Sequence, residues 1–265
     1  MKKILIIAVV LIIALGGAVF VFYNRGLEVI KEPIPSAQVY QPSNSTPSIN
    51  SGQASLPQAT PKTSLSPSSP TSNPAGLKSE VNLAIPFTSQ APSKNWGLPY
   101  AEFCEEASAL MTASYINGWT IPTIEFAEQK MLEIKSFEEK RFGYYKDTTV
   151  EETAVILREF YNFNKVQVLY DPTINDIKKA VADGKAVMAP MAGRLLGNPY
   201  FQSPGPIYHM IVIKGYTKEG NIITNDPGTR NGANFIYSPS VIMNAIHDWN
   251  GGNVESGRKV VIIIG

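Results

Sequence analysis

Residues 207–226 have the sequence IYHMIVIKGYTKEGNIITND, and this stretch decides the fold of the C-terminal half. Mostly apolar residues run from 207 to 216 and from 221 to 226, on either side of the turn residues Lys218-Glu219-Gly220. This pattern predicts a β-hairpin that is buried in a sheet. Further strands are expected at residues 81–87, 166–170, 186–191 and 259–264.

Helical patterns dominate the sequence before this hairpin. We expect helices over residues 104–117, 123–135, 149–163 and 173–183, and one more over 238–249. The motifs Thr149-x-x-Glu152 and Thr173-x-x-Asp176 are typical of helix N-termini. Because most helices come first and the sheet comes last, the predicted class is α+β, with N-terminal helices packed on a C-terminal antiparallel sheet.

The N-terminus carries a second decisive pattern. Lys2 and Lys3 precede an uncharged, mostly apolar run of 20 residues, 4–23. As a helix this run is about 30 Å long, which matches the core of a bilayer. We therefore predict a single-pass transmembrane anchor over residues 1–25, with the C-terminal body extracytoplasmic. The bulky residues 19–23 favour an uncleaved anchor, although Gly16-Gly17-Ala18 is a stretch where cleavage is conceivable.

Residues 26–79 differ in composition from the rest of the chain. Residues 32–78 hold nine of the 20 prolines, among many Ser, Thr, Asn and Gln residues, and contain no Phe, Trp or Cys. Such a segment buries too little apolar area to offset its ordering entropy. We predict a disordered Pro/Ser/Thr-rich linker over 26–79 and one globular domain over 80–265.

Composition limits the possible chemistry. The 23 Lys and Arg residues nearly balance the 22 Asp and Glu residues, so nothing favours a nucleic-acid partner. One Cys cannot form an intramolecular disulfide, and one Cys with two His is too few for a typical structural zinc site. We expect no metal and no cofactor.

Cys104 is the first candidate for chemistry, because it opens the helix predicted over residues 104–117. The free N–H groups and partial positive charge of a helix N-terminus lower the pKa of a thiol and can hold an oxyanion. The alternative for a free Cys is a small buried hydrophobic side chain. Position alone leaves these two interpretations about equal.

His209 is the second candidate, since it lies in the otherwise apolar stretch 207–213. A lone His in such a strand is more often paired with a backbone carbonyl, but one Cys at a helix start makes a Cys–His pair competitive. Asn225 or Asp226 could orient the imidazole. A four-residue loop places Asp226 on the face of His209, whereas a three- or five-residue loop places Asn225 there.

Gln90 is a fourth candidate, since a Gln amide can donate to an oxyanion, although most Gln residues are surface residues. Trp96 and Tyr208 are candidates to line a cleft, with core packing as the alternative.

Three segments together resemble the C thirty-nine-like cysteine peptidases, which are papain-fold relatives of the bacteriocin-leader processing peptidases. The segments are NLAIPFTSQAPSKNW, FCEEASALMTASYING and YHMIVIKGYTKEGNIITNDPGT, within residues 80–265. The resemblance implies a papain-like fold and a peptide or peptidoglycan-peptide substrate. It assigns Cys104 as nucleophile, His209 as general base, Asp226 as orienting residue and Gln90 as oxyanion donor.

The chain departs from this family at one position of the motif. Members often have Gly-Pro after the Cys, whereas this chain has Glu105-Glu106. A carboxylate beside the sulfur opposes thiolate formation. The resemblance and the predicted anchor together give the leading hypothesis, a membrane-anchored extracytoplasmic cysteine peptidase or amidase. The alternatives are a non-catalytic surface binding module and an acyl-transferring relative that uses an amine acceptor.

Overall fold

The computed structural model describes residues 29–42 and 77–265. The anchor predicted over residues 1–25, with its apolar run 4–23, lies outside the described residues. So does most of the predicted linker. Within the described ranges, no helix has both the length and the apolar character needed to span a membrane.

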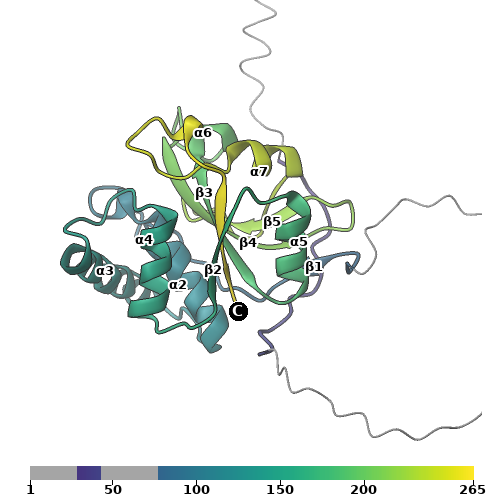
Figure 1. Cartoon of the computed structure of the whole chain (residues 1–265), viewed down its shortest axis with the longest axis horizontal. Coiled ribbons are helices and arrows are strands. Elements are labelled where there is room, and N and C mark those ends of the chain that lie inside the picture. The colour runs from purple at the N-terminus through teal and green to yellow at the C-terminus, as the bar shows by residue number, and fades with distance from the viewer. Residues whose placement is uncertain (1–28, 43–76) are drawn as a thin grey trace, which may run out of the picture.

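The described strands form one antiparallel sheet in the order β2-β7-β3-β4-β5-β6, with β1 added beside β4 (Figure 1). Strands β3, β4 and β7 are buried along their whole length, which explains their nearly continuous apolar sequences. The bounds are Val81–Asn82 (β1), Val166–Tyr170 (β2), Ala186–Ala192 (β3), Tyr208–Tyr216 (β4), Ile222–Asn225 (β5), Phe235–Tyr237 (β6) and Val260–Ile264 (β7).

Helices cover the sheet on both sides, with α2, α3 and α4 on one side and α5 on the other (Figure 1). Helix α2 packs chiefly on β4, and this contact places the start of α2 beside the strand that carries His209. The predicted α+β arrangement is therefore present. The helix bounds are Cys104–Asn117 (α2), Ile124–Arg141 (α3), Val150–Val155 (α4), Ile174–Ala182 (α5), Gly193–Leu196 (α6) and Pro239–Ala245 (α7), and Ile156–Phe160 is a π-helical turn after α4.

Most predicted elements occur close to their expected bounds, and both predicted capping boxes form. The strand predicted over 81–87 is wrong beyond Asn82, because Leu83 forms only an isolated bridge to Gln38 and Pro86 has no N–H to donate. The last helix ends at Ala245 instead of 249, because Ile246 becomes extended and pairs with Met191 of β3. Strand β6 and helix α6 were not predicted from the sequence.

Residues 29–42 lie within the range predicted as a linker, and this segment packs against the domain. Gln38 exchanges backbone hydrogen bonds with the β1 region, and the Glu32 carboxylate accepts hydrogen bonds from Thr217 and Asn221 in the β4–β5 loop. The Tyr40 ring packs edge-on against a helix residue, Tyr115. These polar and aromatic contacts stabilise a segment whose composition alone indicates disorder.

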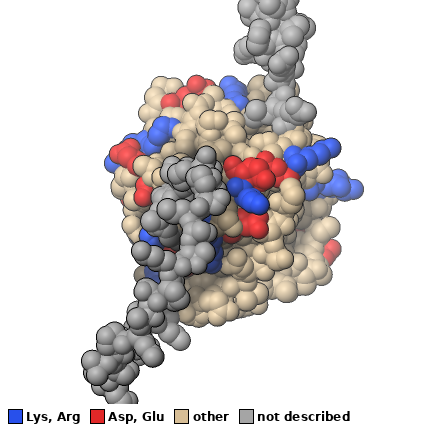
Figure 2. All heavy atoms as spheres, turned by 90° about the vertical axis from the view of Figure 1, so that its right-hand side faces the viewer, with Lys and Arg blue, Asp and Glu red and all other residues tan. Residues whose placement is uncertain are grey.

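Charged side chains of both signs lie next to one another on the face shown in Figure 2. This mixture agrees with the nearly equal numbers of acidic and basic residues in the chain. The potential on this face is therefore not dominated by one sign of charge.

Candidate active site

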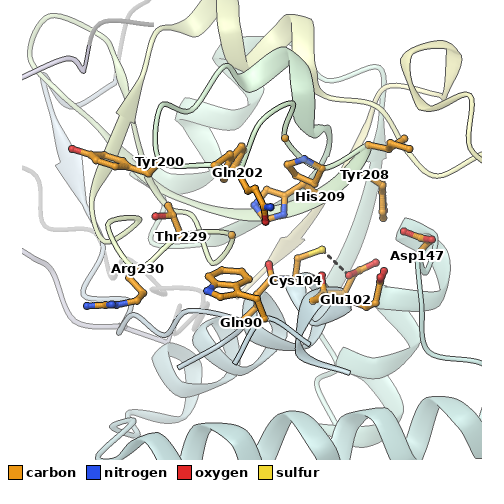
Figure 3. A pocket seen from close by; sticks show the side chains of 18 of the residues that line it. Gln90, Glu102, Cys104, Asp147, Tyr200, Gln202, Tyr208, His209, Thr229 and Arg230 are labelled. Atoms are coloured by element: carbon orange, nitrogen blue, oxygen red, sulfur yellow. Dashed lines mark hydrogen bonds between the residues drawn. The ribbon is translucent and has the colours of Figure 1, made fainter. Parts of the chain in front are cut away.

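A pocket of about 840 Å³ opens where the start of α2 meets the start of β4. Cys104, His209 and Gln90 all line this pocket. Figure 3 shows Cys104 and His209 in the middle part of the pocket, with Arg230 towards one end of the pocket and Glu102 towards the other. Three of the four predicted site residues thus line one pocket, and the fourth, Asp226, contacts His209.

Cys104 is the first residue of α2 and is 7% exposed. Its thiol donates a hydrogen bond to Oε2 of Glu105 at 2.9 Å, drawn as the dashed line in Figure 3. Burial, followed by the charge and hydrogen bond of Glu105, raises the pKa of Cys104 well above its ordinary value. The backbone of Met210, the residue after His209, lowers this pKa but does not outweigh the other causes.

This result corrects one sequence prediction and agrees with another. The start of α2 was expected to lower the pKa of the thiol. Burial is the largest cause of the change, and the two carboxyl groups that follow Cys104 add to it, so the pKa of the thiol is raised and not lowered. The sequence also predicts that a carboxylate beside the sulfur opposes the thiolate, and the charge of Glu105, when it is ionised, does raise the pKa of Cys104.

His209 and Asp226 form a buried pair. His209 Nε2 and Asp226 Oδ1 lie 2.8 Å apart, and both side chains are almost fully buried. The other hydrogen bonds to Asp226 come from Asn198, Gly228 and Tyr237. Burial on its own raises the pKa of Asp226, but the contact with His209 and these hydrogen bonds outweigh burial, so the pKa is lowered. Asp226 is therefore a carboxylate that fixes the orientation of the imidazole.

A β-bulge decides which residue reaches His209. Tyr216 pairs with Ile222, so the loop has five residues, the length for which sequence reasoning places Asn225 on the face of His209. The register then shifts at Lys214, and Val212 pairs with Asn225. This one-residue shift turns Asp226 towards His209.

Asn225 has a different set of partners. Its amide donates to the carbonyls of Ile85 and Pro86, and its side-chain oxygen accepts from the backbone of Asn234. Asn225 therefore ties the segment after β1 to the hairpin.

Gln90 lines the pocket, but its amide is already hydrogen-bonded. Nε2 donates to the carbonyls of Tyr100 at 3.1 Å and Ala101 at 2.8 Å. An amide nitrogen has two N–H groups, so both are in use. The predicted role as an oxyanion donor requires one of these bonds to be exchanged.

Sequence reasoning recognised Glu105 only as an opposing charge. In the structure its Oε1 accepts a hydrogen bond from the Thr148 backbone at 3.1 Å, while Oε2 faces the sulfur. Burial is the largest cause that raises its pKa to about 8. At neutral pH this side chain is therefore mostly a neutral carboxylic acid.

Sequence reasoning missed Asn198, Tyr237 and Gly228. Asn198 and the Tyr237 hydroxyl, at 2.6 Å, both hydrogen-bond to Asp226 Oδ2. A Cβ on Gly228 would lie 2.8 Å from Cε1 and 2.9 Å from Nε2 of His209, so only Gly fits there. The sequence signal for Gly228 is the Pro227-Gly228 pair after Asp226, whereas the other two residues carry no such signal.

The roles of Trp96 and Tyr208 differ. Both line the pocket, but Trp96 is 42% exposed while Tyr208 is 5% exposed and donates its hydroxyl to the Thr148 carbonyl. Across residues 29–42 and 77–265, no group of three or more His, Cys, Asp or Glu side chains is arranged to hold a metal ion.

The family model described as the Peptidase_C39 like family matches residues 82–251. The chain belongs to the Peptidase_C39 like family. This confirms the resemblance to the C thirty-nine-like cysteine peptidases predicted from the three motif segments. The matched range contains Gln90, Cys104, His209 and Asp226. No curated protein is similar enough to the chain to match it.

Solved structures that show some similarity to the chain include a Bacillus anthracis protein described as a C39-like peptidase, at 15% identity and a TM-score of 0.44. That alignment covers 70% of this chain and 98% of the other. A Prevotella intermedia prointerpain A fragment has 12% identity, coverages of 66% and 54%, and a TM-score of 0.35. The interpain A cysteine protease of the same organism has 16% identity, coverages of 52% and 55%, and a TM-score of 0.33. The chain therefore spans about half of each interpain structure.

Proposed function

We propose that the chain is a cysteine peptidase or amidase that hydrolyses peptide-like amides. Cys104 is the nucleophile, His209 the general base and Asp226 the residue that orients the imidazole. The observation that carries the proposal is the 2.8 Å contact between His209 Nε2 and Asp226 Oδ1. This contact holds the ring in the pocket that Cys104 also lines.

The Asp226 carboxylate determines which nitrogen of His209 can act as a base. The Asp226 carboxylate accepts a hydrogen bond from Nε2–H of His209. The lone pair of the neutral ring therefore lies on Nδ1. Nδ1 takes the proton of Cys104 when the sulfur attacks an amide carbonyl, and later gives it to the leaving amine. Water then hydrolyses the thioester formed on Cys104, with His209 acting as base again.

The start of α2 supplies a donor for the developing oxyanion. The backbone N–H of Cys104 is the first of the helix and has no acceptor within it. Gln90 supplies a second donor if one of its two bonds to backbone carbonyls opens when substrate binds.

The pocket has features that suit a peptide with charged groups of both signs. Arg230 and Tyr200 lie towards one end of the pocket, and Glu102 and Asp147 lie towards the other (Figure 3). The exposed ring of Trp96 offers an apolar surface in the same pocket. Peptides, including peptidoglycan peptides with free amino and carboxyl groups, match this distribution of charge and apolar surface.

We further propose that residues 4–23 anchor the chain in the cell membrane, with the peptidase domain outside the cytoplasm. The 20-residue apolar run after Lys2 and Lys3 supports this part of the proposal. Protease protection of the domain in intact cells, compared with lysed cells, tests it. Protection of the domain in intact cells would contradict an extracytoplasmic location.

Labelling of Cys104 tests the catalytic assignment. Cys104 is the single Cys of the chain, so iodoacetamide labelling followed by mass spectrometry reports on this thiol alone. At mildly acidic pH we expect the wild type to react faster than a free thiol and the His209→Ala variant to react more slowly. Wild-type reactivity at or below that of a free thiol, with no slowing in the variant, would contradict the proposal.

A binding module is the second candidate function, and the raised pKa of Cys104 is the observation that favours it. A thiol held by a carboxyl group is a poor nucleophile while that carboxyl group is ionised. In this case a Cys104→Ser variant would bind peptides as well as the wild type does, and neither protein would hydrolyse them. Peptide hydrolysis by the wild type that is abolished in Cys104→Ser excludes this candidate.

A further inference from the structure

The thiol of Cys104 contacts a carboxyl group that the hydrolytic scheme above does not use. Sγ of Cys104 and Oε2 of Glu105 are 2.9 Å apart, and the backbone of Thr148 holds the other carboxyl oxygen at 3.1 Å. Glu105 is 1% exposed and lines the pocket. Its carboxyl group is therefore fixed against the sulfur and is shielded from water.

The titratable groups that interact with Glu105 from the surrounding elements are all acids. They are Cys104 and Glu106 on α2, Glu138 on α3, Asp147 in the loop before α4, and Tyr208 on β4. Two basic side chains, His209 and Arg230, also line the pocket. An ionised Glu105 would thus be a buried anion among other acids, and this disfavours its charged form.

We propose that Glu105 is a catalytic residue whose neutral carboxyl group donates a hydrogen bond to the Cys104 thiolate, and that ionisation of this carboxyl group switches the thiol off. The inference rests on the proposed function, because it requires His209 to take the proton of the thiol. The carboxyl group acts on the sulfur itself, which is the atom that attacks the substrate.

The proton steps balance without an added reagent. The S–H bond of Cys104 breaks, its proton moves to Nδ1 of His209, and the sulfur keeps the electron pair. The O–H group of Glu105 then points at the thiolate across the same 2.9 Å contact and stabilises its charge. When Glu105 has lost its proton, the carboxylate accepts a hydrogen bond from the thiol instead and opposes formation of the thiolate.

The pH profile of alkylation tests the proposal on the full-length protein. Iodoacetamide is uncharged, so its reaction with the Cys104 thiolate does not require a protonated His209. Loss of the imidazolium proton at high pH therefore does not by itself slow the alkylation. With the pKa of Glu105 raised to about 8, the neutral fraction falls about tenfold between about pH 7 and about pH 9. We expect the wild-type rate constant to fall about tenfold over this interval.

The Glu105→Gln variant is the matched comparison. A Gln side chain can accept the Thr148 N–H and donate an N–H to the sulfur at every pH. Its rate constant should not fall between about pH 7 and about pH 9, whatever its value at lower pH. A wild-type rate constant that rises steadily with pH overturns the proposal, even if the Glu105→Gln variant does not fold. If the variant folds, a fall in its rate constant as large as that of the wild type also overturns the proposal.

The Asp147→Asn variant leaves Glu105 in place and supplies a second test. The charge of Asp147 raises the pKa of Glu105, so its removal should move the fall in reactivity to lower pH. A fall that stays at the same pH or moves upward counts against the proposal. The His209→Ala variant separates the two failures, because normal reactivity in that variant overturns the proposed function. Slow reactivity there, with no effect of Glu105→Gln, overturns only the role of Glu105.

Discussion

Replacing Glu138 with Gln is expected to remove part of the pH dependence of folding stability. Glu138 is fully buried on α3, where its carboxyl group interacts with the equally buried carboxyl group of Glu106. Burial, and then the charge of Glu105, raises the pKa of Glu138 from 4.5 to about 9. The carboxyl group is therefore neutral in the folded protein at pH values where the unfolded chain ionises it.

The sign of the effect follows from proton counting. Above about pH 4.5 the unfolded chain loses the Glu138 proton, while the folded chain keeps it up to about pH 9. The contribution to stability is thus complete below pH 4.5 and declines as the pH rises towards 9. One such carboxyl group lowers the free energy of unfolding by about 1.4 kcal/mol per pH unit within this window.

The assay is urea unfolding, followed by Trp fluorescence, at several values between about pH 5 and about pH 8. The Glu138→Gln variant should have a slope of stability against pH that is smaller by about 1.4 kcal/mol per unit. Thermal unfolding should show the same change as about 3 to 6 °C per pH unit for a domain of this size. The control is Asp183→Asn, which removes an exposed partner of Lys179 and should change stability by less than about 0.5 kcal/mol.

Two results would refute this reasoning. One is a wild-type stability that stays level across the window, because then no carboxyl group in the core keeps its proton on folding. The other is an equal slope in the wild type and in Glu138→Gln. That outcome would assign the pH dependence to other buried acids such as Glu106, whose pKa burial and the charges of Glu138 and Glu105 also raise.

Three further predictions concern the site and the N-terminal segment. Asp226→Asn should lower kcat/KM for a peptide substrate by about 10² to 10⁴, because an amide cannot fix the tautomer of His209 as a carboxylate does; circular dichroism controls for folding. Gly228→Ala places a Cβ 2.8 Å from the His209 ring, so kcat should fall at least about tenfold, and an unchanged kcat would show that the ring can move freely. Glu32→Ala removes the hydrogen bonds from the β4–β5 loop and should lower the free energy of unfolding by about 1 to 3 kcal/mol in urea titrations, whereas no change would mean that the segment 29–42 adds no stability.

The sequence determines the local elements well and their ends less well. The bounds of α2 and β2 agree with the prediction to the residue, because a helix start at Cys104 and an alternating strand are both local patterns. The end of α7 was missed, since it depends on a pairing between Ile246 and Met191 that brings distant segments together. The ordered segment 29–42 was missed for the same reason, because its partners lie up to 189 residues away.

The site shows where sequence reasoning stops. The types of Cys104 and His209 and their positions at a helix start and in a strand are visible in the sequence. The choice between Asn225 and Asp226 is not, because it depends on a bulge at Lys214 that moves the register by one residue. Turn length alone gives the wrong face here. The contact between Glu105 and the sulfur is also hidden, since it requires the backbone of Thr148 to hold the carboxyl group in place.

The surroundings of the Cys–His pair shift the pKa values of its two neighbouring carboxyl groups, Asp226 and Glu105, in opposite directions. Asp226 is fully buried, yet its contact with His209 and the hydrogen bonds to both of its oxygens keep it ionised. Burial, with a smaller contribution from the charge of Asp147, raises the pKa of Glu105 to about 8. When the pKa values of two carboxyl groups in one site are shifted apart in this way, the ionised group can orient a base and the neutral group can donate a proton. The Glu-Glu sequence after Cys104, which suggests an impaired nucleophile when ionised, is therefore compatible with an active thiol as long as Glu105 stays neutral.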